Sequence, residues 1–156
     1  MGDDAGRLKR AGLRVTGPRL AVLAALDRAT DAGRHLAVAE LAEEARALRP
    51  RTSTQTVYDC VDALAGGGLV RRVEIPGFPA RYEARVDDNH HHLVCRSCGR
   101  TIDVDCPVGS APCLTPAGGH DFTVDEAEIV FWGRCGSCTD EAGAVDHAVP
   151  EERTTR

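Results

Sequence analysis

Apolar positions in the first half of the chain recur every three or four residues over three separate stretches, which is the spacing of one helix face. Thr16 is a candidate N-cap with Pro18 in the first turn, Pro50 ends the second stretch, and Ser53 is a candidate N-cap for the third. These patterns predict three amphipathic helices before residue 66. The first has Leu20, Leu23 and Leu26 along one face, and the second has Val38, Leu41, Ala45 and Leu48 at helical spacing. The inner face of the third consists of Val57, Cys60, Val61 and Leu64.

The pattern changes after the glycines at 66–68, which end the third predicted helix. Two strand-like runs, 69–75 and 80–83, follow and are joined by the turn sequence Pro-Gly-Phe-Pro at 76–79. Three helices followed by a β-hairpin is the order of a winged helix-turn-helix. Residues 1–86 are therefore predicted to form a DNA-binding domain of that class, in a chain of the α+β class.

The second half of the chain begins with residues 86–90, which break any regular pattern and predict a hinge. Strand-like runs at 93–94, 101–104 and 128–132 predict a small sheet, with a Pro- and Gly-rich loop at 106–119 before the last run. Residues 87–138 are predicted to form a second domain, and residues 139–156 are predicted to be a disordered tail.

Composition suggests that neither domain has a large core. The chain of 156 residues is 42% hydrophobic but only 4% aromatic, and such thin cores usually need a metal, a disulfide or a partner subunit. No stretch approaches the ~20 apolar residues needed to cross a bilayer, so we expect a cytoplasmic protein without a membrane partner. Residues 1–86 carry a charge of +3 and residues 87–156 a charge of −8, which predicts two units with different partners but is weak evidence for DNA.

Two Cys-x-x-Cys turns stand 36 residues apart, and each follows a strand-like run. In a reducing compartment, such pairs are more often metal ligands than disulfides. Two turns that open towards each other place four thiolates around one point, which is the tetrahedral arrangement that zinc takes at ~2.3 Å. Cys95, Cys98, Cys135 and Cys138 are therefore predicted to form a closed structural zinc site, with two disulfides or a redox dithiol as the alternatives.

A run of three histidines begins at the predicted hinge. In an extended strand, the first and third point to one side and His91 points to the other. Imidazoles and carboxylates together suit ferrous iron, manganese, nickel or zinc. Ligands from both halves would let a bound metal fix the orientation of one half to the other. The candidate regulatory ligands are His35, Glu83, His90, His92 and Asp103, and the alternative is a set of solvated histidines beside a loop.

The third predicted helix is the candidate recognition helix, because its apolar inner face leaves polar residues on the outside. Gln55 can pair with an adenine edge, and Tyr58 can contact a thymine methyl group or a phosphate. Arginines near this helix and on the wing are candidate phosphate anchors, although ordinary surface residues are the alternative. The predicted DNA contacts are Arg19, Arg51, Thr54, Gln55, Tyr58 and Arg71, with Arg72 and Arg81 as further candidates on the wing.

Five motifs in this order resemble the ferric uptake regulator family over roughly residues 7–138. They are Arg14-Val15-Thr16-x-Pro18-Arg19, Ser53-x-x-Thr56-Val57-Tyr58, Arg81-Tyr82-Glu83, His90-His91-His92-Leu93-x-Cys95-x-x-Cys98-Gly99 and Gly133-x-Cys135-x-x-Cys138. The resemblance implies a homodimeric repressor that binds palindromic AT-rich DNA and is not an enzyme. It also implies a C-terminal α/β dimerisation domain, a structural Zn²⁺ at the four cysteines and a regulatory Fe²⁺ or Mn²⁺ at the hinge.

Residues 104–109 and 111–116 resemble, more narrowly, the branch that represses catalase genes. In peroxide-sensing members, bound ferrous iron reacts with hydrogen peroxide and oxidises ligand histidines, which correspond here to His35 and His90. Glu83 stands where those relatives carry an aspartate, as it does in iron-responsive members, and Ala127 replaces a histidine of a further metal site. A regulator that responds to iron, zinc or nickel is therefore the alternative within the family.

An alternative of another class is a small zinc-ribbon metalloenzyme or a thiol oxidoreductase, with the hinge residues around a catalytic metal. No substrate cleft or nucleophile–base pair in the sequence supports it. Cys60 is predicted to be a core residue. Cys106 and Cys113 either form a redox pair or simply pack, and His120 is either a second ligand or a buried hydrogen-bonding histidine.

Overall fold

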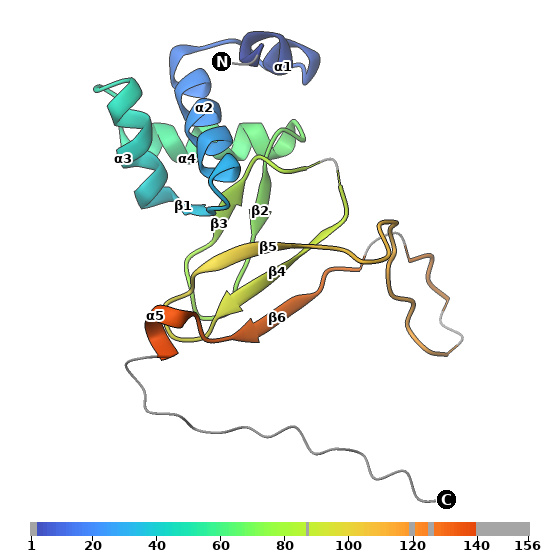
Figure 1. Ribbon diagram of the computed structural model, residues 1–156. Coiled ribbons are helices and arrows are strands. Elements are labelled where there is room, and N and C mark those ends of the chain that lie inside the picture. The colour runs from blue at the N-terminus through green and yellow to red at the C-terminus, as the bar shows by residue number, and fades with distance from the viewer. Residues whose placement is uncertain (1–2, 87, 119–120, 125–126, 140–156) are drawn as a thin grey trace, which may run out of the picture.

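The computed structural model describes residues 3–86, 88–118, 121–124 and 127–139, in which helices α1–α4 lie above two small sheets (Figure 1). The elements in chain order are α1 (Asp4–Arg10), α2 (Gly17–Asp31), β1 (Leu36–Ala37), α3 (Val38–Leu48), α4 (Thr54–Gly66), β2 (Arg71–Val73), β3 (Arg81–Glu83), β4 (His90–Cys95), β5 (Thr101–Asp105), β6 (Val130–Gly133) and α5 (Gly136–Thr139). None of the described helices is long and apolar enough to span a membrane.

The helix starts follow the capping residues in the sequence. Thr16 Oγ1 accepts a hydrogen bond from the backbone N–H of Arg19, and Ser53 Oγ accepts one from Thr56, at 3.4 and 3.1 Å. These bonds fix the first turns of α2 and α4, as the sequence predicts. Helix α1 is an addition to the three predicted helices, and its N-cap Asp3 accepts a hydrogen bond from the N–H of Gly6 at 2.9 Å.

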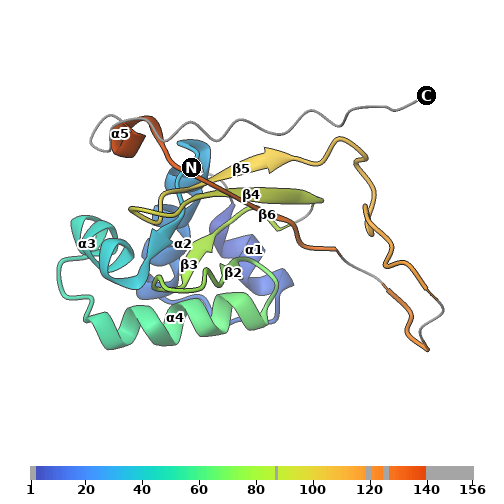
Figure 2. The ribbon, with the colours of Figure 1, turned by 90° about the horizontal axis from the view of Figure 1, so that it is seen from below.

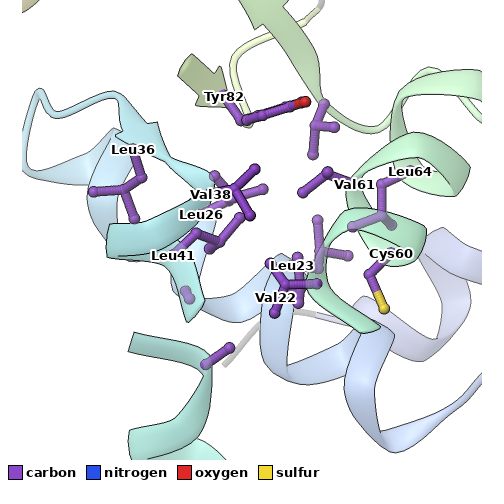
Figure 3. Close-up of a cluster of buried hydrophobic side chains, with 14 of the residues drawn as sticks. Val22, Leu23, Leu26, Leu36, Val38, Leu41, Cys60, Val61, Leu64 and Tyr82 are labelled. Carbon is purple, nitrogen blue, oxygen red and sulfur yellow. The ribbon is translucent and has the colours of Figure 1, made fainter. Parts of the chain in front are cut away.

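The main core lies between α2, α3 and α4 and is closed by Tyr82 of β3 (Figure 3). Leu23 and Leu26 of α2 meet Leu41 of α3 and Leu64 of α4, and all four leucines are fully buried. Burial of each such side chain contributes about 1.5–3 kcal/mol, which is how a core poor in aromatic residues holds the three helices together. Leu48, the last of the regularly spaced apolar residues of α3, is 45% exposed because α3 ends there.

The first sheet has the strand order β1-β3-β2, with both pairs antiparallel. Strands β2 and β3 form the predicted hairpin, although β2 covers only Arg71–Val73 of the predicted run 69–75. Strand β1 was not predicted, because two residues are too short to show a period. It pairs Leu36 with Tyr82 and so ties the connection between α2 and α3 to the wing. The chain thus has the α+β fold of a winged helix, followed by a second three-stranded sheet.

The second sheet has the order β5-β4-β6, with β5 antiparallel and β6 parallel to the central strand β4. Strand β4 starts at His90, so all three histidines belong to it and the last residue of the predicted hinge is already in the sheet. The described part of the stretch 106–119 contains no helix, and this loop projects from the end of the sheet opposite to α5 (Figures 1 and 2).

The two sheets contact each other through a small apolar cluster. Val73 and Ile75 from the wing pack on Val94 of β4, and Trp132 of β6 lies against them. The hinge cluster described below also lies between the sheets. The predicted domain boundary at residue 86 stays a prediction, and residues 140–156 of the predicted tail lie outside the described residues.

Candidate metal centres and nucleic-acid interface

Four thiols from the two Cys-x-x-Cys turns converge beyond the ends of β4 and β6. Cys95 is the last residue of β4, and because β6 runs parallel to β4, the turn that follows β6 lies beside it. The backbone N–H of Cys135 donates to Cys95 Sγ at 3.3 Å. One sulfur atom from each of Cys95, Cys98, Cys135 and Cys138 lies within 4.8 Å of all the others. The parallel strand pair therefore builds the four-thiol cluster that the sequence predicts.

The charges on these thiols favour a cation at their centre. Backbone N–H groups of Cys135 and Cys98 lower the pKa of Cys95 to about 6. Hydrogen bonding with Cys135 and Cys98 raises the pKa of Cys138 to about 12, so the crowded thiols cannot all ionise alone. A divalent cation that prefers tetrahedral sulfur ligands lets four thiolates coexist, and zinc fits this set. All seven cysteines are free, and the 3.7 Å between Cys98 and Cys135 Sγ is far beyond the ~2.05 Å of a disulfide, so the structure does not contain the alternative disulfides.

Gly99 fixes the first of these turns against the wing. Its φ of 71° is in the left-handed region that favours glycine. A Cβ at this position would also lie 2.5 Å from Cδ1 of Phe78, a residue of the wing hairpin. The turn that carries Cys95 and Cys98 therefore packs directly on the DNA-binding half of the molecule.

A second cluster, which we call the hinge cluster, consists of His35, Glu83, His90, His92 and Asp103. His35 Nε2 lies 2.8 Å from Glu83 Oε2 and 2.9 Å from Asp103 Oδ1. His92 Nε2 lies 3.5 Å from Glu83 Oε1, and His90 Nε2 is hydrogen-bonded to the same oxygen at 3.1 Å. The structure therefore brings all five predicted regulatory residues together, although their role as ligands stays a prediction.

The arrangement of the strands around the hinge explains why these residues, which are distant in the sequence, lie close together. His35 directly precedes β1, and Glu83 is the last residue of β3, so the first sheet holds both. His92 and Asp103 are opposite each other in the β4–β5 register, and His90 is two residues from His92 on the same face. Two ligand candidates thus come from the first sheet and three from the second.

The hinge cluster is buried and its polar atoms are poorly paired. A neutral His35 Nε2 has at most one hydrogen, so it cannot donate to both carboxylates. Six buried atoms of four residues have no hydrogen-bond partner of good geometry among the described residues: His35 Nδ1 and Nε2, Glu83 Oε2, His92 Nδ1 and Nε2, and Asp103 Oδ1. Buried polar atoms without partners are costly, and convergent imidazole and carboxylate lone pairs fit a divalent cation of the iron or manganese type.

The close contacts in the hinge cluster shift the pKa values of three of its residues. Burial alone lowers the pKa of His35, but the adjoining carboxylates of Asp103 and Glu83 outweigh it and raise this pKa to about 9. Burial alone raises the pKa of Glu83, but His35 and His92 reverse this and hold it far below its ordinary value. The pKa of Asp103 is also lowered, because His35 outweighs the effect of burial. Without a metal, the cluster therefore holds a proton on His35 between two carboxylates.

Two residues that the sequence analysis missed orient the cluster. Asp88 Oδ1 lies 2.9 Å from His90 Nδ1 and fixes the ring whose other nitrogen faces Glu83. Arg85 donates to Asp88 at 2.7 Å and to Asp105 at 2.7 Å, which ties the hinge segment to the end of β5. The signal available in the sequence was an acidic residue two positions before a candidate ligand, because metal-ligating histidines commonly hydrogen-bond a carboxylate through the second nitrogen.

The outer face of α4 carries the predicted recognition residues. Thr54, Gln55 and Tyr58 are exposed, Tyr58 by 47%, while the apolar face of the helix is buried. Gln55 Nε2 donates to Asp59 at 2.9 Å, and Thr54 Oγ1 accepts from Arg46 at 2.7 Å, so both are held by neighbours. In Figure 2, α4 lies on the outside of the molecule, away from the second sheet.

The predicted phosphate anchors differ in their surroundings. Arg51 is exposed beside the start of α4, whereas Arg19 is half-buried and donates to the Arg14 carbonyl at 2.9 Å. On the wing, Arg71 is half-buried, and Arg81 contacts the His35 carbonyl at 3.1 Å. Arg81 is thereby tied to the hinge rather than presented to a ligand. All of these DNA contacts stay predictions.

The structure also describes the three remaining cysteines, Cys60, Cys106 and Cys113. Cys60 is buried in the main core, in line with the sequence analysis. Cys106 and Cys113 lie close to His91, with one donor atom of each residue within 4.8 Å of the others. His120 lies outside the described residues.

A winged helix joined to a second three-stranded sheet, with a four-thiol cluster and an imidazole–carboxylate cluster at the junction, defines a metal-responsive regulator of transcription. The model of the ferric uptake regulator family matches residues 10–131, and the chain belongs to this family. A relative from Mycobacterium bovis that is 49% identical over 137 residues, which cover 88% of this chain and 90% of that protein, is named as a transcriptional regulator, and the enzyme alternative is therefore wrong.

Known proteins resemble the chain over most of its length. Ferric uptake regulation protein 1 of Mycolicibacterium fortuitum is 52% identical over 130 residues, which cover 83% of this chain and 78% of that protein. The crystal structure of the Vibrio cholerae ferric uptake regulator is similar in fold, with a TM-score of 0.65 at 24% identity over 85% of this chain and all of that one. The Campylobacter jejuni peroxide stress regulator matches with a TM-score of 0.50 at 27% identity, over 65% of this chain and 68% of that one.

Proposed function

We propose that this chain is a metal-dependent repressor with a regulatory Fe²⁺/Mn²⁺ site at the hinge cluster, through which it senses hydrogen peroxide when iron is bound, and that it controls catalase or other oxidative-stress genes. The observation that carries the proposal is the position of His35 Nε2, 2.8 and 2.9 Å from two buried carboxylates. A cation held by His35, Glu83, His90, His92 and Asp103 would satisfy four of the unpaired atoms of this cluster, namely Nε2 of His35 and of His92, Glu83 Oε2 and Asp103 Oδ1.

Metal binding affects DNA binding because the ligands come from two sheets. His35 precedes β1, and β1 leads directly into α3 of the helix-turn-helix. Ligands on β4 and β5 belong to the other sheet, so a shared cation fixes the helices relative to that sheet. The bound metal shifts the population towards the DNA-binding shape only by its difference in affinity for the two shapes.

The protein acts on DNA as a homodimer in this proposal, with zinc at the four cysteines. Palindromic operators need two recognition helices related by a two-fold axis, and one chain carries one such helix, α4. The outer face of the second sheet offers a surface for the partner. Leu93 and Phe131 are register partners there, and they are 39% and 46% exposed.

The position of the two imidazoles supports the proposed peroxide sensing. Ferrous iron held at this site would activate hydrogen peroxide by one-electron reduction, and the imidazole that is oxidised would return this electron, so that the ring supplies both electrons of the net reaction. The expected net change adds one oxygen atom to an imidazole carbon of His35 or His90 and leaves one water molecule per peroxide. Both rings are buried within the ligand cluster, so the oxidant forms next to them and the damage is local. A modified ring ligates poorly, and the two sheets then lose their shared cation.

The second candidate is an iron-responsive regulator, and Glu83 favours it. The names of similar proteins agree with both functions, because the Mycolicibacterium fortuitum protein is named for ferric uptake and the Campylobacter jejuni protein for peroxide stress. The two functions differ in one respect, namely whether low peroxide inactivates the iron form.

The test compares two metal forms of the same protein. Iron-loaded and manganese-loaded samples, prepared without oxygen, are exposed to low hydrogen peroxide and then assayed for operator binding and for peptide masses. We expect the iron form alone to lose DNA binding and to gain one oxygen atom on the peptides carrying His35 or His90. If both forms keep binding DNA and those peptides stay unmodified, the protein is the iron-responsive regulator instead.

A further inference from the structure

We infer that His91, Cys106 and Cys113 form a separate zinc site on the outer face of the second sheet. His91 points away from His90 and His92, since neighbours on a strand alternate between faces. Its Nε2 lies 3.3 Å from Cys113 Sγ, and one donor atom from each of the three residues lies within 4.8 Å of the others. The site is therefore distinct from the hinge cluster, although both share β4.

His91 is buried, and neither a dimer interface nor a solvated loop accounts for this burial. The residue is only 1% exposed even though Leu93, its neighbour on the same face, is 39% exposed. The cover comes from the chain after β5, which brings Cys113 over the ring. His91 Nδ1 has no hydrogen-bond partner among the described residues, so the ring is oriented by the cysteine side alone. A buried imidazole facing two thiols is a donor set ready for a soft or borderline cation.

Cys106 sits in the same kind of backbone cradle as Cys95 of the four-thiol cluster. The N–H groups two and three residues after Cys95, from Ser97 and Cys98, point at its sulfur. Those of Val108 and Gly109 point in the same way at the Cys106 sulfur. A left-handed glycine follows in each turn, Gly99 at φ 71° and Gly109 at φ 77°. Such a cradle stabilises a thiolate, the form that binds metal.

The donors predict which ion binds. Two thiolates and one neutral imidazole are softer than the mixed imidazole–carboxylate set at the hinge, and they suit zinc in a tetrahedral site. Two thiolates also neutralise a divalent cation. With three ligands among the described residues, the fourth position is open to water or to another small ligand. Bound zinc would hold the loop 106–113, which has no helix or strand of its own, against β4.

Zinc content tests this site directly. Full-length protein is purified with a reductant, loaded with zinc alone, freed of weakly bound metal, and analysed for zinc per protomer. The double variant Cys106→Ser/Cys113→Ser should hold one zinc ion fewer than wild type. The matched control Cys60→Ala removes a thiol from the helical core, distant from all three clusters, and should hold as much zinc as wild type. Equal zinc in all three proteins would overturn the proposal.

A second variant covers the case in which the double variant does not fold. Cys113→His keeps three zinc ligands and loses one thiolate, so it should retain the wild-type amount of zinc. After substitution with cobalt, its thiolate-to-metal absorption should be weaker than that of wild type. An unchanged cobalt spectrum, or a wild-type mass lower by two hydrogens that marks a Cys106–Cys113 disulfide in the zinc-loaded protein, would contradict the zinc site.

Discussion

A proton on His35 competes with the regulatory metal, and the competition has a predictable size. The folded protein raises the pKa of His35 from 6.5 to about 9, so folding favours the protonated ring. This contribution to stability is therefore fully present below pH 6.5 and is lost as the pH rises through about 9. Since each pKa unit corresponds to about 1.4 kcal/mol, the metal-free protein should lose about 3 kcal/mol of unfolding free energy across this window.

The lowered pKa values of Glu83 and Asp103 have the opposite sign, but they act elsewhere. Carboxylates of this kind contribute stability above their ordinary pKa and lose it in acid, well below the window of His35. The assay is urea unfolding at several values from pH 6.5 to pH 9, on protein with zinc retained and the regulatory metal withheld. Wild type and His35→Gln are compared, because other titrating groups are common to both and cancel in the difference.

The same proton predicts the pH dependence of metal binding. Manganese must displace it, so affinity at the hinge should rise up to tenfold per pH unit between pH 6.5 and about 9. His35→Gln should bind manganese more weakly and show a smaller slope. Parallel stability curves for wild type and variant, together with equal slopes in the manganese titrations, would refute the assignment of the proton to His35.

Two further predictions concern zinc and DNA. Cys98→Ser should lose tightly held zinc and run as a monomer or aggregate in size-exclusion chromatography, because three thiols no longer close the site that joins the two turns; a soluble zinc-free dimer would contradict this. Gln55→Ala should weaken binding to the best operator by ~1–3 kcal/mol and relax discrimination, whereas Arg19→Ala should weaken binding to all sequences and reduce the salt slope by about one. Equal losses on specific and random DNA for Gln55→Ala, measured by titration at several salt concentrations, would show that Gln55 does not read bases.

Local rules in the sequence predicted much of the helical half. Caps at Thr16 and Ser53 and the stop at Pro50 act within one or two turns, so no knowledge of distant contacts is needed. The two-residue strand β1 and the helix α1 were missed, the former because its pairing with Tyr82 depends on a partner 46 residues away. Leu48 keeps the apolar spacing of α3 but is exposed, because periodicity continues to the last residue of a helix even where the neighbouring helices no longer cover it.

The candidate metal sites show the same difference between what local sequence patterns predict and what depends on distant contacts. Spacing alone predicted the four-thiol cluster, and the donor types predicted the hinge set. Neither indicated that Asp88 orients His90 or that Cys113 covers His91, because both contacts depend on how the chain folds back over β4. Such long-range contacts lie beyond what a period or a motif in one sequence can specify.

The parallel pairing of β4 with β6 has a consequence for how the protein is made. Parallel neighbours cannot be joined by a tight turn, and here the whole segment 96–129 separates the two strands. Closing so long a loop is slow, whereas the helices form from nearby contacts and fold early. During synthesis, Cys95 and Cys98 emerge well before Cys135 and Cys138, so the four-thiol cluster can form only after the second pair of cysteines has emerged. With zinc as the staple, metal supply at the time of translation governs how quickly this sheet matures.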